Sequence, residues 1–171
     1  MTTPHITTLR TALETAYING ATASCLAYRP QFVSNNHKEG KKVLSSVEDE
    51  LLACDQFQIS VAFITMSGIT PLLQTLKELE KRGIPGRILT TDYLTFSDPK
   101  ALRKLEEFSN LHVKMYVTDQ TEEGFHTKGY IFKKEEMYRI IVGSSNMTLS
   151  ALTVNREWNT RIVSTEQSEY A

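Results

Sequence analysis

The sequence predicts an α/β fold in which a mixed β-sheet is sandwiched between helices, and two patterns lead to this prediction. Apolar, β-branched segments alternate with amphipathic helical segments in the middle of the chain, which is typical of parallel strands joined by helices. Near the C-terminus, two strand-like segments are separated only by the charged residues 133–136. That spacing indicates a hairpin, so antiparallel strands join the same sheet.

The composition is that of an ordinary globular chain. The 171 residues fit one domain, with 40% hydrophobic and 23% charged residues. No apolar run approaches the roughly 18 residues that cross a bilayer, and the N-terminus lacks an apolar signal core. We therefore expect a cytoplasmic protein with no membrane contact. The net charge of -1 argues against a uniformly basic nucleic-acid binder, although it leaves room for a local basic site.

The cysteine and histidine patterns argue against a metal site. Cys25 and Cys54 form no CxxC pair, and we expect both thiols to be reduced and mostly buried. None of the four histidines lies in an HExxH pattern. The expected chemistry therefore uses no metal and no other cofactor.

Three regions are expected along the chain. Residues 1–42 combine a helix at 5–18 with a loop at 28–42, residues 43–165 form the domain itself, and residues 166–171 form a frayed tail or linker. Two interpretations of the loop stay open, a solvated linker and an arm that contacts phosphate groups. The basic or potentially basic residues of this loop are Arg29, His37, Lys38, Lys41 and Lys42.

Helices and strands alternate through the middle of the chain. The capping box Ser45–Glu48 predicts the start of a helix. A second helix, 68–82, has a stripe of leucines and ends at Gly83. A third helix uses Asp98 as N-cap and Pro99 as its first residue, and continues to about residue 108. Inward-facing residues of the first helix are Val47, Leu51 and Leu52. The strands are predicted at 57–65, 87–91 and 111–118.

The C-terminal part predicts a hairpin, a short helix and a last strand. Glu157 begins that strand, and the alternation of side chains places Trp158 on the opposite face, where we expect it in the core, with a base-stacking platform as the alternative. The predicted elements are strands 125–132 and 137–142, helix 147–152 and strand 157–163.

Two residues of the hairpin suggest phosphate chemistry. His126 and Lys128 stand two positions apart on a predicted strand, so their side chains share a face about 7 Å apart. A neutral imidazole is a nucleophile towards phosphorus, and a neighbouring ammonium holds a phosphate oxygen. Alone, a His-x-Lys triplet is weak, because a single histidine is more often structural or solvent-facing.

The segment Gly143–Asn146 and the later Glu157 add to this pattern. The segment GSSN comes directly between a strand and a helix, a geometry that presents backbone amides to an anion. The side chains of Ser144, Ser145 and Asn146 add donors. A carboxylate at Glu157 would orient an imidazole and stabilise its protonated form. The order and spacing of these pieces make the combined pattern much stronger than each part.

The pattern HTK, GSSN and NREWN resembles the phospholipase D superfamily motif HxK, GSxN and a downstream Glu, in its small nuclease branch. Upstream segments, among them YRPQF and SVAFITMSGI, resemble the N-terminal phospholipase D-like domain of bacterial superfamily 2 (DEAD/DEAH-type) helicases. The resemblance covers about residues 25–163. It implies a phospholipase D/nuclease-like fold and, in a longer protein, an ATP-binding helicase region as partner.

The resemblance also implies a metal-independent reaction on DNA, with RNA left open. His126 would attack the phosphodiester and form a phosphohistidine, and a second histidine would protonate the leaving alcohol. Lys128, Ser144, Ser145 and Asn146 would bind phosphate oxygens, and Glu157 would position a histidine.

Two departures from the family pattern matter. The full motif has an acidic residue five positions after the lysine, where this chain has Lys133, which argues against a lipase. The chain also has one HxK motif, whereas the mechanism needs two histidines, so we expect a symmetric homodimer that completes the active site.

Two functions from different classes stay open. The first is a nuclease. The alternative is a catalytically silent module that binds DNA and dimerises a helicase. Candidate nucleic-acid contacts are the basic residues Lys133, Lys134, Arg139 and Arg156.

Overall fold

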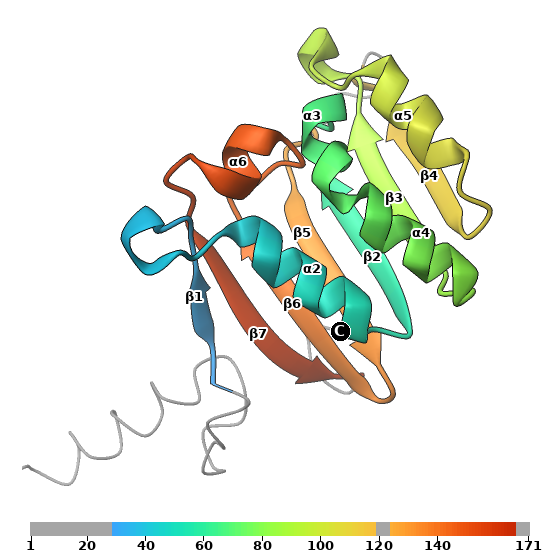
Figure 1. Ribbon diagram of the computed structural model, residues 1–171. Coiled ribbons are helices and arrows are strands. Elements are labelled where there is room, and N and C mark those ends of the chain that lie inside the picture. Colours follow the sequence, from blue (N-terminus) through green and yellow to red (C-terminus); the bar gives the residue numbers. More distant parts are fainter. Residues whose placement is uncertain (1–28, 119–123, 167–171) are drawn as a thin grey trace, which may run out of the picture.

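The structure is a computed structural model that describes residues 29–118 and 124–166 (Figure 1). The described strands form one seven-stranded mixed sheet in the order β1-β7-β6-β5-β2-β3-β4. Strands β2, β3 and β4 are parallel to one another, and all other neighbouring pairs are antiparallel. The α/β fold with a mixed sheet is therefore confirmed. The strands are β1 (Gln31–Val33), β2 (Gln56–Val61), β3 (Gly86–Thr91), β4 (Leu111–Tyr116), β5 (Lys128–Lys134), β6 (Met137–Gly143) and β7 (Asn159–Thr165).

Helices α2, α4 and α5 lie on the same face of the sheet (Figure 1), so the described residues show the mixed sheet with helices but not the predicted helices on both faces. Side chains alternate accordingly along β2, where Phe57, Ile59 and Val61 are buried and Gln58 is exposed. The helix predicted at 5–18 lies outside the described residues, as does Cys25. The described helices are η2 (His37–Glu39), α2 (Val43–Ala53), α3 (Met66–Ile69), η3 (Thr70–Leu72), α4 (Leu73–Lys81), η4 (Tyr93–Thr95), α5 (Pro99–Glu106) and α6 (Leu149–Thr153).

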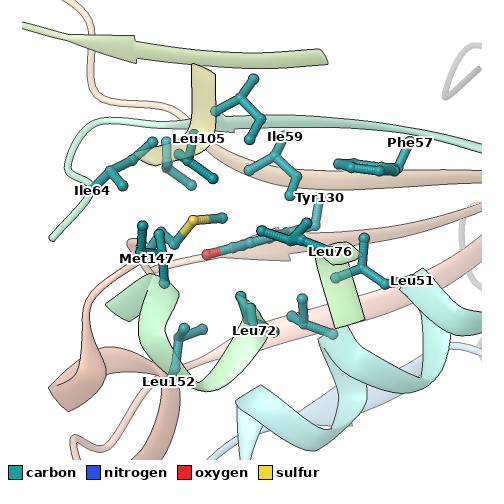
Figure 2. Packing of buried hydrophobic residues seen from close by; sticks show 14 of the residues in the cluster. Leu51, Phe57, Ile59, Ile64, Leu72, Leu76, Leu105, Tyr130, Met147 and Leu152 are labelled. Atoms are coloured by element: carbon teal, nitrogen blue, oxygen red, sulfur yellow. The ribbon is translucent and has the colours of Figure 1, made fainter. Parts of the chain in front are cut away.

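The hydrophobic core lies between the sheet and these helices. Figure 2 shows Tyr130 of β5 among apolar side chains from the sheet and helices, with its hydroxyl oxygen on the side of Met147. That hydroxyl donates a hydrogen bond of 3.0 Å to the carbonyl of Ser145. Because the whole ring is buried, this bond connects the core to the loop between β6 and α6. Labelled neighbours in Figure 2 include Ile59, Leu72 and Leu76.

The start of α2 differs from the sequence prediction. The helix begins at Val43 after Lys42, whose side chain makes no capping bond, so Ser45–Glu48 lies inside the helix and is not a capping box. Val47 and Leu51 are fully buried as predicted. Leu52 is exposed, because it lies about 100° further round the helix than Leu51.

The leucine-rich helix predicted at 68–82 consists of three shorter pieces, α3, η3 and α4. The break falls around Pro71, which lacks the amide hydrogen that a continuous helix needs. The buried stripe and the ending are as predicted, since Gly83 has a φ of +67°. Asp98 also caps α5 as predicted, accepting a bond of 2.8 Å from the Lys100 amide.

Part of the predicted loop 28–42 belongs to the sheet. Residues Gln31–Val33 form β1 and pair with β7 at the edge. The sequence missed this strand because three residues are too few for a periodic pattern. Among the described residues, none of the helices is long and apolar enough to cross a membrane.

Candidate active site at the end of the sheet

His126 lies just before β5, which begins at Lys128 and not at the predicted residue 125. The His126 side chain is exposed, and Lys128 is half-buried. The Lys128 Nζ lies 3.0 Å from His126 Nδ1 and donates a bond of 2.9 Å to the His126 carbonyl. Since an ammonium only donates, Nδ1 accepts here, and the neutral ring then holds its proton on Nε2.

Two contacts with β2 and the residues after it hold this segment in place. The hydroxyls of Ser60 and Thr127 are hydrogen-bonded at 2.6 Å. The ring of Phe63 meets the His126 ring edge-to-face, with centroids 6.0 Å apart. Phe63 in turn packs on Phe96 at 5.1 Å. The imidazole is therefore backed by an aromatic wall on one side.

Phe63 also positions Asn146. Its backbone amide donates to Asn146 Oδ1 at 3.1 Å, and its carbonyl accepts from the Met147 amide at 3.1 Å. Among the described residues, the Asn146 amide nitrogen has no hydrogen-bond partner, so its two N–H donors are available. His126 and Asn146 therefore both contact Phe63, the first through its ring and the second through its backbone amide. The sequence analysis missed Phe63, although its place after a buried strand is a usual position for site residues.

Ser144 and Glu157, two further predicted site residues, are bonded to each other. The Ser144 hydroxyl donates to the Glu157 carboxylate, and the Trp158 amide donates to the same hydroxyl at 3.0 Å. A backbone bond of 3.1 Å from the Ser144 amide to the Trp158 carbonyl completes the link. Glu157 is 8% exposed and precedes β7, which begins at Asn159 and not at 157. In this structure Glu157 binds Ser144, and its predicted role in positioning a histidine stays a prediction.

The charges of Lys128 and Glu157 act on each other. Burial lowers the pKa of Lys128 below its ordinary value, while the Glu157 carboxylate acts in the opposite direction. Burial also raises the pKa of Tyr130, and Glu157 adds to that rise. The site therefore holds one cation and one carboxylate in a partly desolvated place.

Ser145 faces away from the site. Its side chain is fully buried, and its hydroxyl accepts a bond of 2.9 Å from Asn159 Nδ2. Asn159 also accepts from the Ser145 amide at 3.2 Å and donates to the Val33 carbonyl at 3.1 Å. Ser145 thus fixes the loop against β1 and β7. Sequence reasoning missed Asn159, whose only signal is its place in NREWN.

The helix after this loop begins later than predicted. Helix α6 starts at Leu149 with Thr148 as its N-cap, so two residues separate Asn146 from the helix. The donors expected from a helix N-terminus are therefore not at GSSN. Side chains of Ser144 and Asn146 remain as the donors of this loop.

Most of the candidate nucleic-acid contacts lie away from the site. Lys133 pairs with Glu166, and Lys134 lies 3.4 Å from Asp55. Both lysines end β5, about 16–20 Å along the strand from Lys128. Arg139 points to the helix-covered face, 3.4 Å from Glu50. Arg156 differs, because it is exposed next to Glu157.

Trp158 is 74% exposed, so its predicted place in the core is wrong. The predicted alternation holds, but Glu157 and Asn159 lie on the buried face and Trp158 lies on the exposed one. Its ring meets Phe32 edge-to-face at 5.9 Å. In the described part of the chain, no group of three or more His, Cys, Asp or Glu side chains is arranged to hold a metal ion.

Comparisons with known proteins give the family and the fold. The family model described as "Cardiolipin synthase, PLD-like domain" matches residues 51–171. NucT from Helicobacter pylori is 15% identical, with a TM-score of 0.61 over 78% of this chain and 84% of that one. Nuc from Salmonella typhimurium, a phospholipase D family member, is 16% identical, with a TM-score of 0.58 over 81% and 86%. Phosphatidylserine synthase from Haemophilus influenzae has the same identity and TM-score over 81% of this chain and 35% of its own. No curated protein matched significantly.

Proposed function

Because the chain belongs to the phospholipase D-like family, whose model matches residues 51–171, we propose that it is a metal-independent phosphodiesterase that cleaves DNA. The observation that supports this most is the meeting of His126, Lys128 and Asn146 around Phe63. A nucleophile, a cation and an amide donor are the groups that attack on a phosphodiester requires, and contacts with one another or with Phe63 link them here.

His126 is the proposed nucleophile. After its proton has moved from Nε2 to Nδ1, the Nε2 of His126 attacks phosphorus, the bond from phosphorus to the leaving oxygen breaks, and that oxygen takes a proton from the partner subunit's His126. The partner subunit's His126 then takes a proton from water, whose oxygen attacks phosphorus and breaks the P–N bond. Lys128 and Asn146 hold the non-bridging oxygens throughout, where negative charge develops.

Ser144 and Glu157 support this arrangement. Before substrate binds, the Ser144 hydroxyl is directed at the Glu157 carboxylate and not at an open position. Glu157 is buried and lies close enough to Lys128 to affect its pKa. We propose that this carboxylate stabilises the imidazolium formed during the reaction, with Ser144 at the edge of the phosphate site.

The reaction is tested by trapping the covalent intermediate. The chain is incubated with end-labelled single-stranded and plasmid DNA in EDTA, then denatured and examined for an acid-labile protein–DNA adduct. We expect cleavage and an adduct, both lost in His126→Ala. The matched control is His112→Ala, because His112 is an exposed histidine on β4. Binding without cleavage or adduct in the unmodified chain would instead support the silent DNA-binding module.

Because the proposed reaction needs a second histidine, we propose that the chain forms a homodimer in which the partner subunit's His126 supplies it. We expect light scattering to show a dimer and the specific activity to fall on dilution. His37 lies in a groove that also reaches Glu157, so the chain offers a histidine that tests this point. A monomer with constant specific activity, inactivated by His37→Ala, would refute the dimeric site.

The resemblance to helicase-linked domains leads us to propose that this chain serves an ATP-driven helicase region. The test is whether such a region, joined to residues 1–171, makes cleavage depend on ATP. Equal cleavage with and without ATP would remove this part of the proposal.

A further inference from the structure

A groove of about 450 Å³ adjoins the proposed active site at Glu157. It lies between the segment that follows β1 and the segment between α6 and β7. A volume of this size is within the range of small-ligand sites, about 300–1,000 Å³. The lining residues used in the argument are Phe32, His37, Lys38, Arg156, Glu157 and Trp158.

The groove has an aromatic wall that the folded chain leaves open. Phe32 is 64% exposed and Trp158 is 74% exposed, although both have large apolar rings. They meet edge-to-face at an interplanar angle of 84°, so each ring keeps at least one face uncovered by the other. Aromatic faces left in water next to a polar site are typical of a binding surface.

The groove also has free positive charge. Among the described residues, Lys38 and Arg156 form no ion pair, whereas the hairpin lysines, Lys133 and Lys134, are paired with carboxylates. The one carboxylate of the lining, Glu157, is already bonded to Ser144. The charge of the groove therefore complements a phosphate backbone.

From these observations we propose that the groove binds single-stranded nucleic acid beside the scissile phosphate. Trp158, supported by Phe32, stacks on one base, and Lys38 and Arg156 contact the flanking phosphates. The strand is single because a duplex keeps its base faces covered by neighbouring bases. The proposal deepens the proposed function, on which it rests, and its position follows from Glu157, which belongs to both the groove and the site.

The test uses the only tryptophan of the chain as its reporter. A His126→Ala chain is titrated with a short oligothymidine in EDTA, and Trp158 fluorescence is followed. We expect quenching that weakens as salt rises, and no comparable quenching by a duplex of the same length. Saturable oligothymidine binding, measured by anisotropy, with no change in fluorescence would overturn the proposal.

Variants test the assignment by anisotropy of a labelled oligothymidine. Truncation of a stacked aromatic weakens binding roughly fivefold to a hundredfold, so we expect this loss in Trp158→Ala and a much smaller one in Trp158→Phe. Lys38→Ala with Arg156→Ala should weaken binding and flatten its salt dependence. Lys133→Ala with Lys134→Ala is the matched control and should change neither.

Two further outcomes separate this proposal from others. If Trp158→Ala turns a dimer into a monomer and leaves oligothymidine affinity unchanged, the groove is a subunit interface and the proposal is wrong. Because His126→Ala cleaves nothing, quenching reports on the groove alone. Quenching without cleavage by the unmodified chain would support the groove and refute the nuclease, and cleavage without quenching would do the reverse.

Discussion

Replacing Gly143 by alanine should open the end of the sheet that holds the site. A Cβ built on Gly143 lies 2.2 Å from the Trp158 carbonyl oxygen and 2.6 Å from the Asn159 Cα. These obstacles are backbone atoms of the neighbouring strand, to which Gly143 is paired through Asn159. Ordinary contact needs a separation of at least about 3.4 Å, so the two chains must move apart by roughly 1 Å.

The cost of that movement has two parts. Overpacking against atoms that cannot rotate away costs about 1–3 kcal/mol. The two bonds between Ser144 and the Trp158 backbone then lengthen, at about 1 kcal/mol each. Together they amount to a loss of about 3–5 kcal/mol in the free energy of unfolding, which corresponds to a fall in Tm of about 6–20 °C for a chain of this size.

Thermal and urea unfolding, followed by circular dichroism, measure this loss. Gly129→Ala is the matched control, because a Cβ at Gly129 meets no atom within 4 Å and the residue also adjoins the site. We expect that variant to stay within about 0.5 kcal/mol of the original chain. If Gly143→Ala unfolds at the same temperature as Gly129→Ala, the close approach of β6 to the Trp158 backbone is wrong.

Three other predictions follow from charge and burial. Burial lowers the pKa of Lys128, and its charged form is lost as pH rises through that pKa, so kcat/KM for a small phosphodiester should fall at a lower pH than with an ordinary lysine. The variant Lys128→Arg should move this fall to higher pH. Identical pH profiles of the two proteins would contradict the role of Lys128. Burial raises the pKa of Cys54 to about 11. In a Cys25→Ser chain, iodoacetamide should therefore label Cys54 far more slowly in the folded protein than in the protein unfolded by urea. Equal labelling rates would show that the thiol is accessible in the folded protein. Glu50 is 2% exposed and pairs with Arg139 and Arg161, whose side chains reach water. Glu50→Ala should therefore lower the free energy of unfolding by about 2 kcal/mol, which is less than the loss of a fully buried pair. An unchanged midpoint of urea unfolding would contradict this prediction.

The sequence was sufficient for the parts of the fold that depend on local patterns. Strand β2 alternates buried apolar residues with polar ones, and α5 begins with the local signals Asp98 as N-cap and Pro99 as first residue. The predictions were wrong where a contact with a residue distant in sequence determines the local structure. The run 57–65 ends as a strand at Val61 because Phe63 leaves the ladder to bond Asn146, 83 residues away in sequence.

The same distinction applies to the site. The motif residues could be identified because their types and spacing are local properties of the sequence. Their partners could not, because Phe63, Asn159 and Thr127 are recognisable only from contacts between strands. Trp158 was placed in the core because the face of Glu157 was taken as the outer one, whereas Glu157 and Asn159 are buried and Trp158 is exposed.

The contact between Lys128 and His126 leads to a last prediction, which concerns the tautomer of His126 before substrate binds. While Lys128 donates to Nδ1, the neutral imidazole holds its proton on Nε2, the atom that must attack phosphorus. A bound phosphate offers the ammonium a charged acceptor, which is a stronger partner than a neutral ring nitrogen. We therefore expect phosphate to draw Lys128 away and leave Nδ1 free to take the proton.

Nitrogen NMR of the imidazole ring distinguishes the two tautomers. In the free chain, Nδ1 of His126 should have the shift of an unprotonated nitrogen, and inorganic phosphate should move that proton to Nδ1. Lys128→Met removes the donor, so its ring should show both tautomers without phosphate, while His112 serves as an internal reference in every sample. An imidazole protonated on Nδ1 in the free chain would mean that Lys128 does not control the tautomer. In that case Nε2 would already be unprotonated, and able to attack, before the substrate binds.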